Sequence, residues 1–112
     1  MKQQDLSDVD AEDCRPSDPV PEGYLSRELT IVNRKGLHAR ATAKLVQCIE
    51  EFNAQVLVSR CGETVGGTSI MGILTLGAGP GSTIRVAAKG TDAEDLLDAV
   101  EKLIASRFGE DE

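Results

Sequence analysis

The sequence predicts a small α+β domain in which helices cover one face of a single sheet. Three observations lead to this class. With 112 residues, the chain is long enough for one domain but not for two. From residue 24 onward, strand-like and helix-like hydrophobic periods follow one another in the order β-α-β-β-α-β-α. One connection between strands is a hairpin and two contain a helix, which is typical of a sheet with its helices on one face.

The first two elements are a strand and a helix. Alternation of apolar and polar residues predicts a strand over residues 25–32, with a buried face formed by Leu25, Leu29 and Ile31. A polar break that ends in Gly36 separates this strand from the next element. Residues 39–52 then show the helical period, and their apolar face is formed by Leu45, Val46, Ile49 and Phe52.

A hairpin is expected next. Val56 and Val58 alternate with more polar neighbours and predict a second strand. Cys61 and Gly62 are expected to form a tight turn, and residues 63–67 the returning strand. Glycine suits the positive φ that such a turn requires, whereas cysteine is an unusual first residue for it.

A short apolar segment follows the hairpin. Residues 69–76 are almost wholly apolar, and Ser69 is well suited as the N-cap of a short helix. The glycine-rich loop at residues 77–81 leads into a strand over residues 83–89. A phosphate-binding loop leads into a helix instead, so this loop is interpreted as a turn.

The last element is a helix. Thr91 and Glu94 form a capping-box pattern that predicts where this helix begins. Its apolar face is formed by Leu96, Leu97, Val100, Leu103 and Ile104. Gly109 marks its expected end, because glycine is the residue most often found just past a helix C-terminus.

Charge divides the chain into two parts. Residues 1–22 contain seven acidic and two basic residues and three of the four prolines, without any hydrophobic period. We expect a disordered acidic extension over residues 1–22 and one domain over residues 23–112. The formal net charge of −7 argues against nucleic-acid binding. The chain shows neither a signal peptide nor an apolar run long enough to enter a membrane, so we expect a cytoplasmic protein.

The three cysteines do not suggest a metal site. Cys14, Cys48 and Cys61 include no C-x-x-C pair, and the chain has only one histidine. We therefore expect three free thiols in a reducing compartment. No metal and no cofactor is predicted.

The single histidine is the candidate for chemistry. His38 follows Gly36-Leu37 and directly precedes a helical period, which places it at or near a helix N-cap. The free N–H groups and the positive dipole end of a helix N-terminus favour a bound anion. Arg40 can hydrogen-bond phosphate oxygens, and a neutral imidazole is a nucleophile. These are the parts that a phosphoryl acceptor needs, whereas no general base for hydrolysis is evident.

Two motifs resemble those of a known family. Gly36-Leu37-His38-Ala39-Arg40 is similar to the active-site signature of HPr, the histidine-containing phosphocarrier of the phosphoenolpyruvate-dependent phosphotransferase system. Ser69-Ile70-Met71-Gly72 and the following Thr75-Leu76-Gly77 resemble the family's regulatory-serine segment. The separation of the motifs also fits, and the resemblance covers about residues 25–108.

The resemblance implies a fold and a function. The fold would be an open-faced β-sandwich, a four-stranded antiparallel sheet covered by three helices. Phosphorylated enzyme I would phosphorylate His38 on Nδ1, and His38 would pass the group to an enzyme IIA-type acceptor. Arg40 would stabilise the phosphoryl group during both transfers. The protein would be a carrier that turns over no substrate alone, and we expect a monomer.

The resemblance also implies a regulatory serine and a docking surface. Ser69 would be phosphorylated by an HPr kinase, in addition to its role as an N-cap. Ala43 and Gln47 of the first helix would contact partner proteins together with residues of the short helix. Ile70, Met71 and Leu74 could instead be ordinary core residues, but so short a helix cannot bury every apolar side chain.

One departure from the family pattern leaves the branch of the pathway open. The family usually has proline where this chain has Ala41. The alternative function is a regulatory protein of a nitrogen-related phosphotransferase branch, which would control partners by its phosphorylation state without sugar transport. An RNA-binding domain is a remote third candidate. The chain has only three aromatic residues and a negative net charge, so it lacks stacking platforms for bases.

Overall fold

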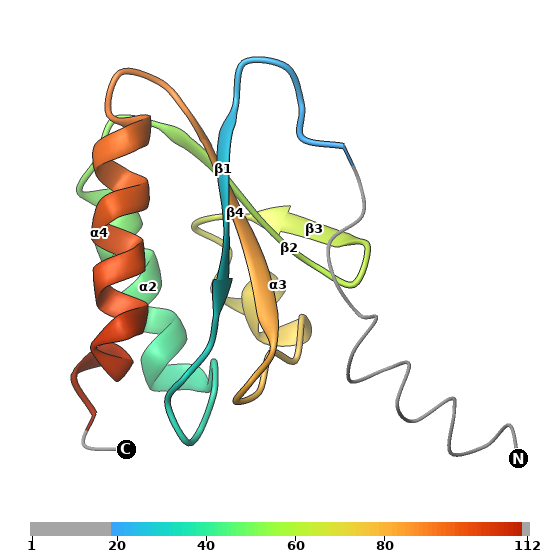
Figure 1. Ribbon diagram of the computed structural model, residues 1–112, viewed down its shortest axis with the longest axis vertical. Coiled ribbons are helices and arrows are strands. Elements are labelled where there is room, and N and C mark those ends of the chain that lie inside the picture. Colours follow the sequence, from blue (N-terminus) through green and yellow to red (C-terminus); the bar gives the residue numbers. More distant parts are fainter. Residues whose placement is uncertain (1–18, 111–112) are drawn as a thin grey trace, which may run out of the picture.

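The computed structural model describes residues 19–110 and contains one sheet and a layer of helices (Figure 1). The predicted acidic extension lies outside the described residues up to position 18. The elements are β1 (Leu25–Thr30), α2 (Ala39–Glu50), β2 (Gln55–Arg60), β3 (Glu63–Gly66), α3 (Ile70–Thr75), β4 (Thr83–Lys89), α4 (Ala93–Ala105) and the 3₁₀ turn η1 (Arg107–Gly109). No helix within residues 19–110 combines the length and the apolar character that crossing a bilayer requires.

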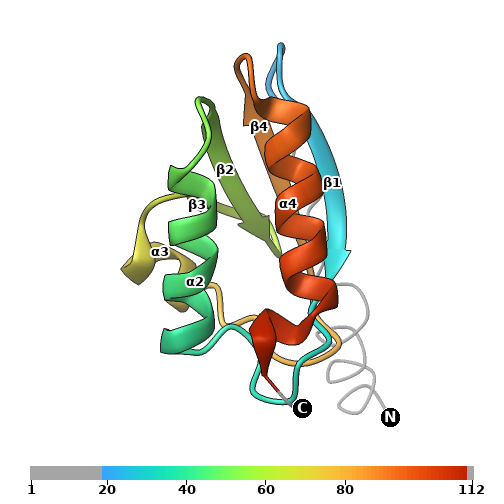
Figure 2. The same ribbon diagram turned by 90° about the vertical axis from the view of Figure 1, so that its left-hand side faces the viewer.

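The four strands form an antiparallel sheet in the order β1-β4-β2-β3. In Figure 2, α2 and α4 lie side by side in front of this sheet, and α3 lies beside α2. The predicted fold class, an open-faced α+β sandwich with three helices over a four-stranded antiparallel sheet, is therefore confirmed. Because β4 pairs with both β1 and β2, the long connection through α3 brings the second half of the chain back into the middle of the sheet.

The core lies between the sheet and the helices. Its apolar side chains come from every layer, and the largest fully buried ones include Ile31, Leu45, Val58, Ile73, Ile84, Val86, Leu96, Val100 and Phe108. The expectation that Leu25 belongs to the buried face is wrong, because this residue is 51% exposed. It is the first residue of β1, which is an edge strand of the sheet.

The hairpin between β2 and β3 has the predicted two-residue turn. Cys61 and Gly62 both have positive φ, at 56° and 82°, as a type I′ turn requires. The expectation of three free thiols is wrong for Cys61, which forms a disulfide. Cys48 is a free, half-buried thiol on α2, and desolvation together with the charge of Glu51 raises its pKa.

The predicted capping box at the start of α4 does not form. α4 begins at Ala93, and its N-cap residue Asp92 makes no side-chain cap hydrogen bond. The Asp92 carboxylate instead accepts a bond of 2.8 Å from the backbone N–H of Asn53, and the Thr91 hydroxyl accepts one of 3.3 Å from the Asn53 amide. These side chains therefore fasten the α2–β2 loop to α4.

Candidate functional site

His38 is the N-cap of α2, as predicted. Its backbone is extended, with φ −78° and ψ −176°, and its Nδ1 accepts a hydrogen bond of 3.2 Å from the backbone N–H of Arg40. The His38 carbonyl accepts the N–H of Thr42 at 2.8 Å, which closes the first helical turn. One ring nitrogen thus points directly at the N-terminus of α2, where the partial positive charge of the helix lies.

Gly36 allows the loop before His38 to pack closely against the 77–81 loop. Its φ is +68°, and a Cβ at this position would lie 2.7 Å from the carbonyl oxygen of Ala78. The neighbouring Leu37 donates its N–H to the same carbonyl at 2.8 Å. The glycine-rich loop therefore supports the loop that carries His38.

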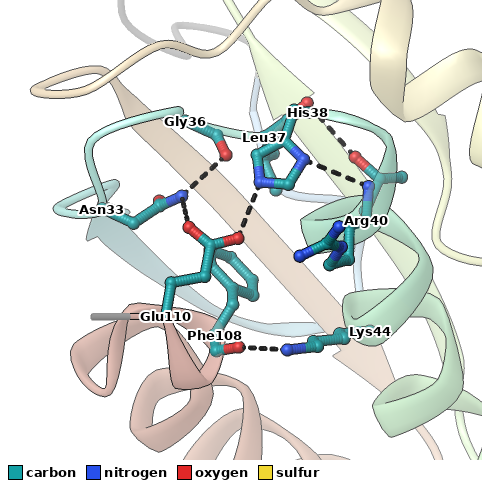
Figure 3. Close-up of polar contacts among 9 residues, drawn as sticks. Asn33, Gly36, Leu37, His38, Arg40, Lys44, Phe108 and Glu110 are labelled. Carbon is teal, nitrogen blue, oxygen red and sulfur yellow. Dashed lines mark hydrogen bonds and ion pairs between the residues drawn. The ribbon is translucent and has the colours of Figure 1, made fainter. Parts of the chain in front are cut away.

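The second ring nitrogen of His38 meets the C-terminal segment. Nε2 lies 2.7 Å from Oε2 of Glu110, although 72 residues separate the two in the chain (Figure 3). Asn33, which is fully buried, donates from its side-chain amide to Oε1 of Glu110 at 3.0 Å and to the Gly36 carbonyl at 2.9 Å. The hydrogen bond from Asn33, followed by that with His38, lowers the pKa of the Glu110 carboxyl below its ordinary value.

A left-handed turn after α4 brings Glu110 to the site. Arg107, Phe108 and Gly109 have φ values of 59°, 55° and 76°. The left-handed region costs a non-glycine residue about 1–2 kcal/mol. Phe108 is fully buried, and its carbonyl accepts a hydrogen bond of 2.6 Å from Nζ of Lys44 on α2. Apolar burial and this bond offset the cost of the left-handed backbone.

The two ring contacts define the tautomer of His38. Because the Arg40 N–H is a donor, Nδ1 must supply a lone pair, and the ring proton of the neutral imidazole then lies on Nε2. That proton is donated to the Glu110 carboxylate. Nδ1 is therefore the ring nitrogen that carries the lone pair, and it faces the helix end that favours an anion.

Arg40 is exposed at the start of α2, and its side chain lies below the His38 ring in Figure 3. The structure therefore brings together the two residues predicted for phosphoryl binding. It also adds Asn33, Lys44 and Glu110, which the sequence reasoning did not single out as site residues. Nothing local in the sequence links position 110 to position 38.

The predicted regulatory and docking residues lie on α2, the helix that His38 caps, and on α3, which contacts α2. Ser69 is exposed and is the N-cap of α3, where its hydroxyl accepts the N–H of Gly72 at 3.1 Å. On α3, Met71 is 71% exposed, Ile70 is 41% exposed and Leu74 is half-buried. On α2, which contacts α3, Gln47 is exposed and Ala43 is half-buried. On α3, Ile70 and Met71 therefore expose apolar side chains.

Residues 25–106 match a family model described as the phosphorylation site of the HPr component of the phosphotransferase system. The chain belongs to the HPr family. It is therefore a phosphocarrier protein of the phosphotransferase system and not a catalytic enzyme.

Relatives from several bacteria support the family. The chain is 50% identical to the phosphocarrier protein HPr of Cupriavidus necator over 88 residues, which are 79% of this chain and 99% of that protein. It is 40% identical to the phosphocarrier protein NPr of Shewanella violacea over 86 residues, which are 77% of this chain and 94% of that protein. A crystal structure of HPr from Thermoanaerobacter tengcongensis matches with a TM-score of 0.75 at 38% identity, covering 79% of this chain and 99% of that one.

Proposed function

We propose that His38 accepts a phosphoryl group on Nδ1 from phosphorylated enzyme I and donates it to an enzyme IIA-type acceptor. The observation that carries this proposal is the position of Nδ1, which points at the first free N–H groups of α2 beside Arg40. A phosphoryl group on Nδ1 would be stabilised both by the positive end of the α2 dipole and by the Arg40 guanidinium.

The transfer needs no metal and no hydrolytic base from this chain. The Nδ1 lone pair attacks phosphorus, and the electron pair of the breaking bond leaves with the donor. The Arg40 N–H, which bonds to Nδ1 in the unphosphorylated protein, is then free to donate to a phosphoryl oxygen. The Arg40 guanidinium neutralises part of the charge on the transferring group. In the second step a nucleophilic atom of the acceptor bonds to phosphorus, the bond between Nδ1 and phosphorus breaks, and its electron pair returns to Nδ1.

The patch formed by Ile70, Met71 and Leu74 with Ala43 and Gln47 is the proposed contact surface for both partners. Met71 and Ile70 are exposed on α3, which contacts the helix that His38 caps, and methionine adapts readily to different surfaces. Phosphorylation of Ser69 by an HPr kinase would place negative charge at this surface and weaken docking of enzyme I. We also propose that the protein acts as a cytoplasmic monomer.

A regulatory branch is the second candidate. The similarity to a protein named NPr and the alanine at position 41 favour a nitrogen-related phosphotransferase role, in which the phosphorylation state of His38 controls partners. Affinity capture with phosphorylated and unphosphorylated protein separates the two. Recovery of a sugar-specific acceptor would refute the regulatory candidate.

The phosphocarrier proposal is tested with enzyme I and phosphoenolpyruvate. Wild-type protein is expected to gain one acid-labile phosphoryl group, and His38→Ala none. Ser69→Ala serves as a control that keeps the label, because the hydroxyl that it removes accepts the N–H of Gly72 at the start of α3. Equal labelling of wild type and His38→Ala would refute the proposal.

A further inference from the structure

Glu110 contacts His38 at the ring nitrogen that faces away from α2. The contact is short, at 2.7 Å, and the Glu110 side chain is only 16% exposed. The other oxygen of the carboxylate is held at 3.0 Å by the buried amide of Asn33. The Glu110 carboxylate is thus held by two hydrogen bonds within the chain, one with His38 and one from Asn33, before any partner protein binds.

We propose that Glu110 is a positioning residue for phosphoryl transfer, which holds the Nε2–H of His38 and keeps the ring positively charged while Nδ1 carries the phosphoryl group. The inference rests on the proposed function of His38 and adds a residue to it. The role follows from the two contacts of the His38 ring. Nδ1 bonds to the N-terminus of α2, and Nε2 bonds to the Glu110 carboxylate (Figure 3).

The proton balance of the two steps explains what this contact achieves. When Nδ1 forms its bond to phosphorus, the bond to the donor breaks and its electron pair leaves with the donor. The ring then bears the phosphoryl group on Nδ1 and a proton on Nε2, so it is an imidazolium. The Glu110 carboxylate stabilises that charge, and no proton has to leave.

Onward transfer benefits from the same arrangement. When the N–P bond breaks, its electron pair returns to Nδ1, and the ring leaves as neutral imidazole with its proton still on Nε2. A ring that had lost this proton would have to leave as an imidazolate anion, which is a much poorer leaving group. Glu110 therefore keeps the phosphorylated ring in the form that donates.

Other charged groups on the elements that carry His38 act in the opposite direction. The β1–α2 loop contains Arg34 and Lys35 besides the neutral Asn33, and the first half of α2 contains Arg40 and Lys44. They disfavour the positive charge that the phosphorylated ring carries. Glu110, from the segment after η1, is the carboxylate that counters them at the ring itself.

The test uses proteins phosphorylated with phosphoramidate, a small donor that needs no partner protein. Wild type, Glu110→Gln and Glu50→Gln are compared by following the ³¹P resonance of the phosphohistidine against pH. Glu50→Gln is the matched control, since it removes the same charge from an exposed position at the far end of α2. Circular dichroism establishes that all three proteins are folded.

The expected result is a titration midpoint about one pH unit lower in Glu110→Gln than in the other two, equivalent to about a tenfold change. Identical midpoints in wild type and Glu110→Gln would overturn the inference. Labelling of wild type by enzyme I and phosphoenolpyruvate is measured separately. Absence of that label would refute the proposed transfer from enzyme I to His38. The ³¹P titration of protein phosphorylated with phosphoramidate would still decide the role of Glu110.

Discussion

Lys44 of α2 donates a hydrogen bond of 2.6 Å to the carbonyl of Phe108, which lies 64 residues later in the chain. This bond ties the helix that begins at His38 to the segment that carries Glu110. The Phe108 ring is fully buried below it. Two interactions therefore hold the segment that carries Glu110 against the site: the hydrogen bond from Lys44 and the burial of the Phe108 side chain.

Replacing Lys44 with methionine tests the charged contact. The change keeps much of the side-chain length but removes the donor, and a hydrogen bond from a charged group contributes about 1.5–3 kcal/mol. We expect the free energy of unfolding, measured with urea, to fall by about this amount. Lys35→Met, at an exposed loop position, should leave it nearly unchanged. Equal effects of the two variants would contradict the assigned role of Lys44.

Arg107→Gly tests the left-handed turn. Arg107 is exposed and has φ 59°, a conformation that glycine adopts without steric penalty. The variant should raise the free energy of unfolding by up to about 1 kcal/mol. A marked loss of stability in thermal or urea unfolding would show that the arginine side chain, rather than its backbone, matters here.

Ala41→Pro tests the departure from the usual family pattern. Ala41 lies in the first turn of α2, where its N–H has no backbone acceptor among the described residues. Proline is tolerated at such positions, so stability should change by less than about 1 kcal/mol and phosphoryl uptake should persist. Ala43→Pro, one half-turn further on, should cost about 3 kcal/mol or more in urea unfolding. Similar losses in both variants would place the helix start elsewhere.

Low pH is expected to remove the stability that Glu110 gains from its contacts with Asn33 and His38. Its pKa is lowered in the folded protein, first by Asn33 and then by His38. A lowered folded-state pKa adds stability above the unfolded-state value, near pH ~4.3, and this stability is lost as pH falls through the folded-state value. Urea unfolding of wild type and Glu110→Gln should therefore differ near pH 6 and converge in strong acid. A difference that stays constant with pH would contradict this linkage.

The sequence predicted those parts of the site that depend on local signals. Gly36, His38 and Arg40 lie within five residues, and a glycine before a helical period identifies the N-cap without any tertiary information. Ser69 is recognisable as an N-cap because serine favours that position and a short apolar segment follows it. Both positions are set by the chain immediately around them.

The contacts that the sequence did not predict are long-range. Thr91 and Glu94 have capping-box spacing, but Asn53 from another loop binds Thr91 and Asp92 instead. Glu110 reaches His38 only because Phe108 is drawn into the core and the backbone turns left-handed. No local pattern at residues 107–110 predicts that turn.

The position of the phosphoryl group on the ring tests the central claim most directly. Wild-type protein labelled by enzyme I and phosphoenolpyruvate can be analysed by ¹H–¹⁵N and ³¹P NMR of the His38 ring. The account predicts phosphorus on Nδ1, the nitrogen that faces α2, with Nε2 still directed at Glu110. Phosphorus on Nε2, or on any residue other than His38, would contradict it.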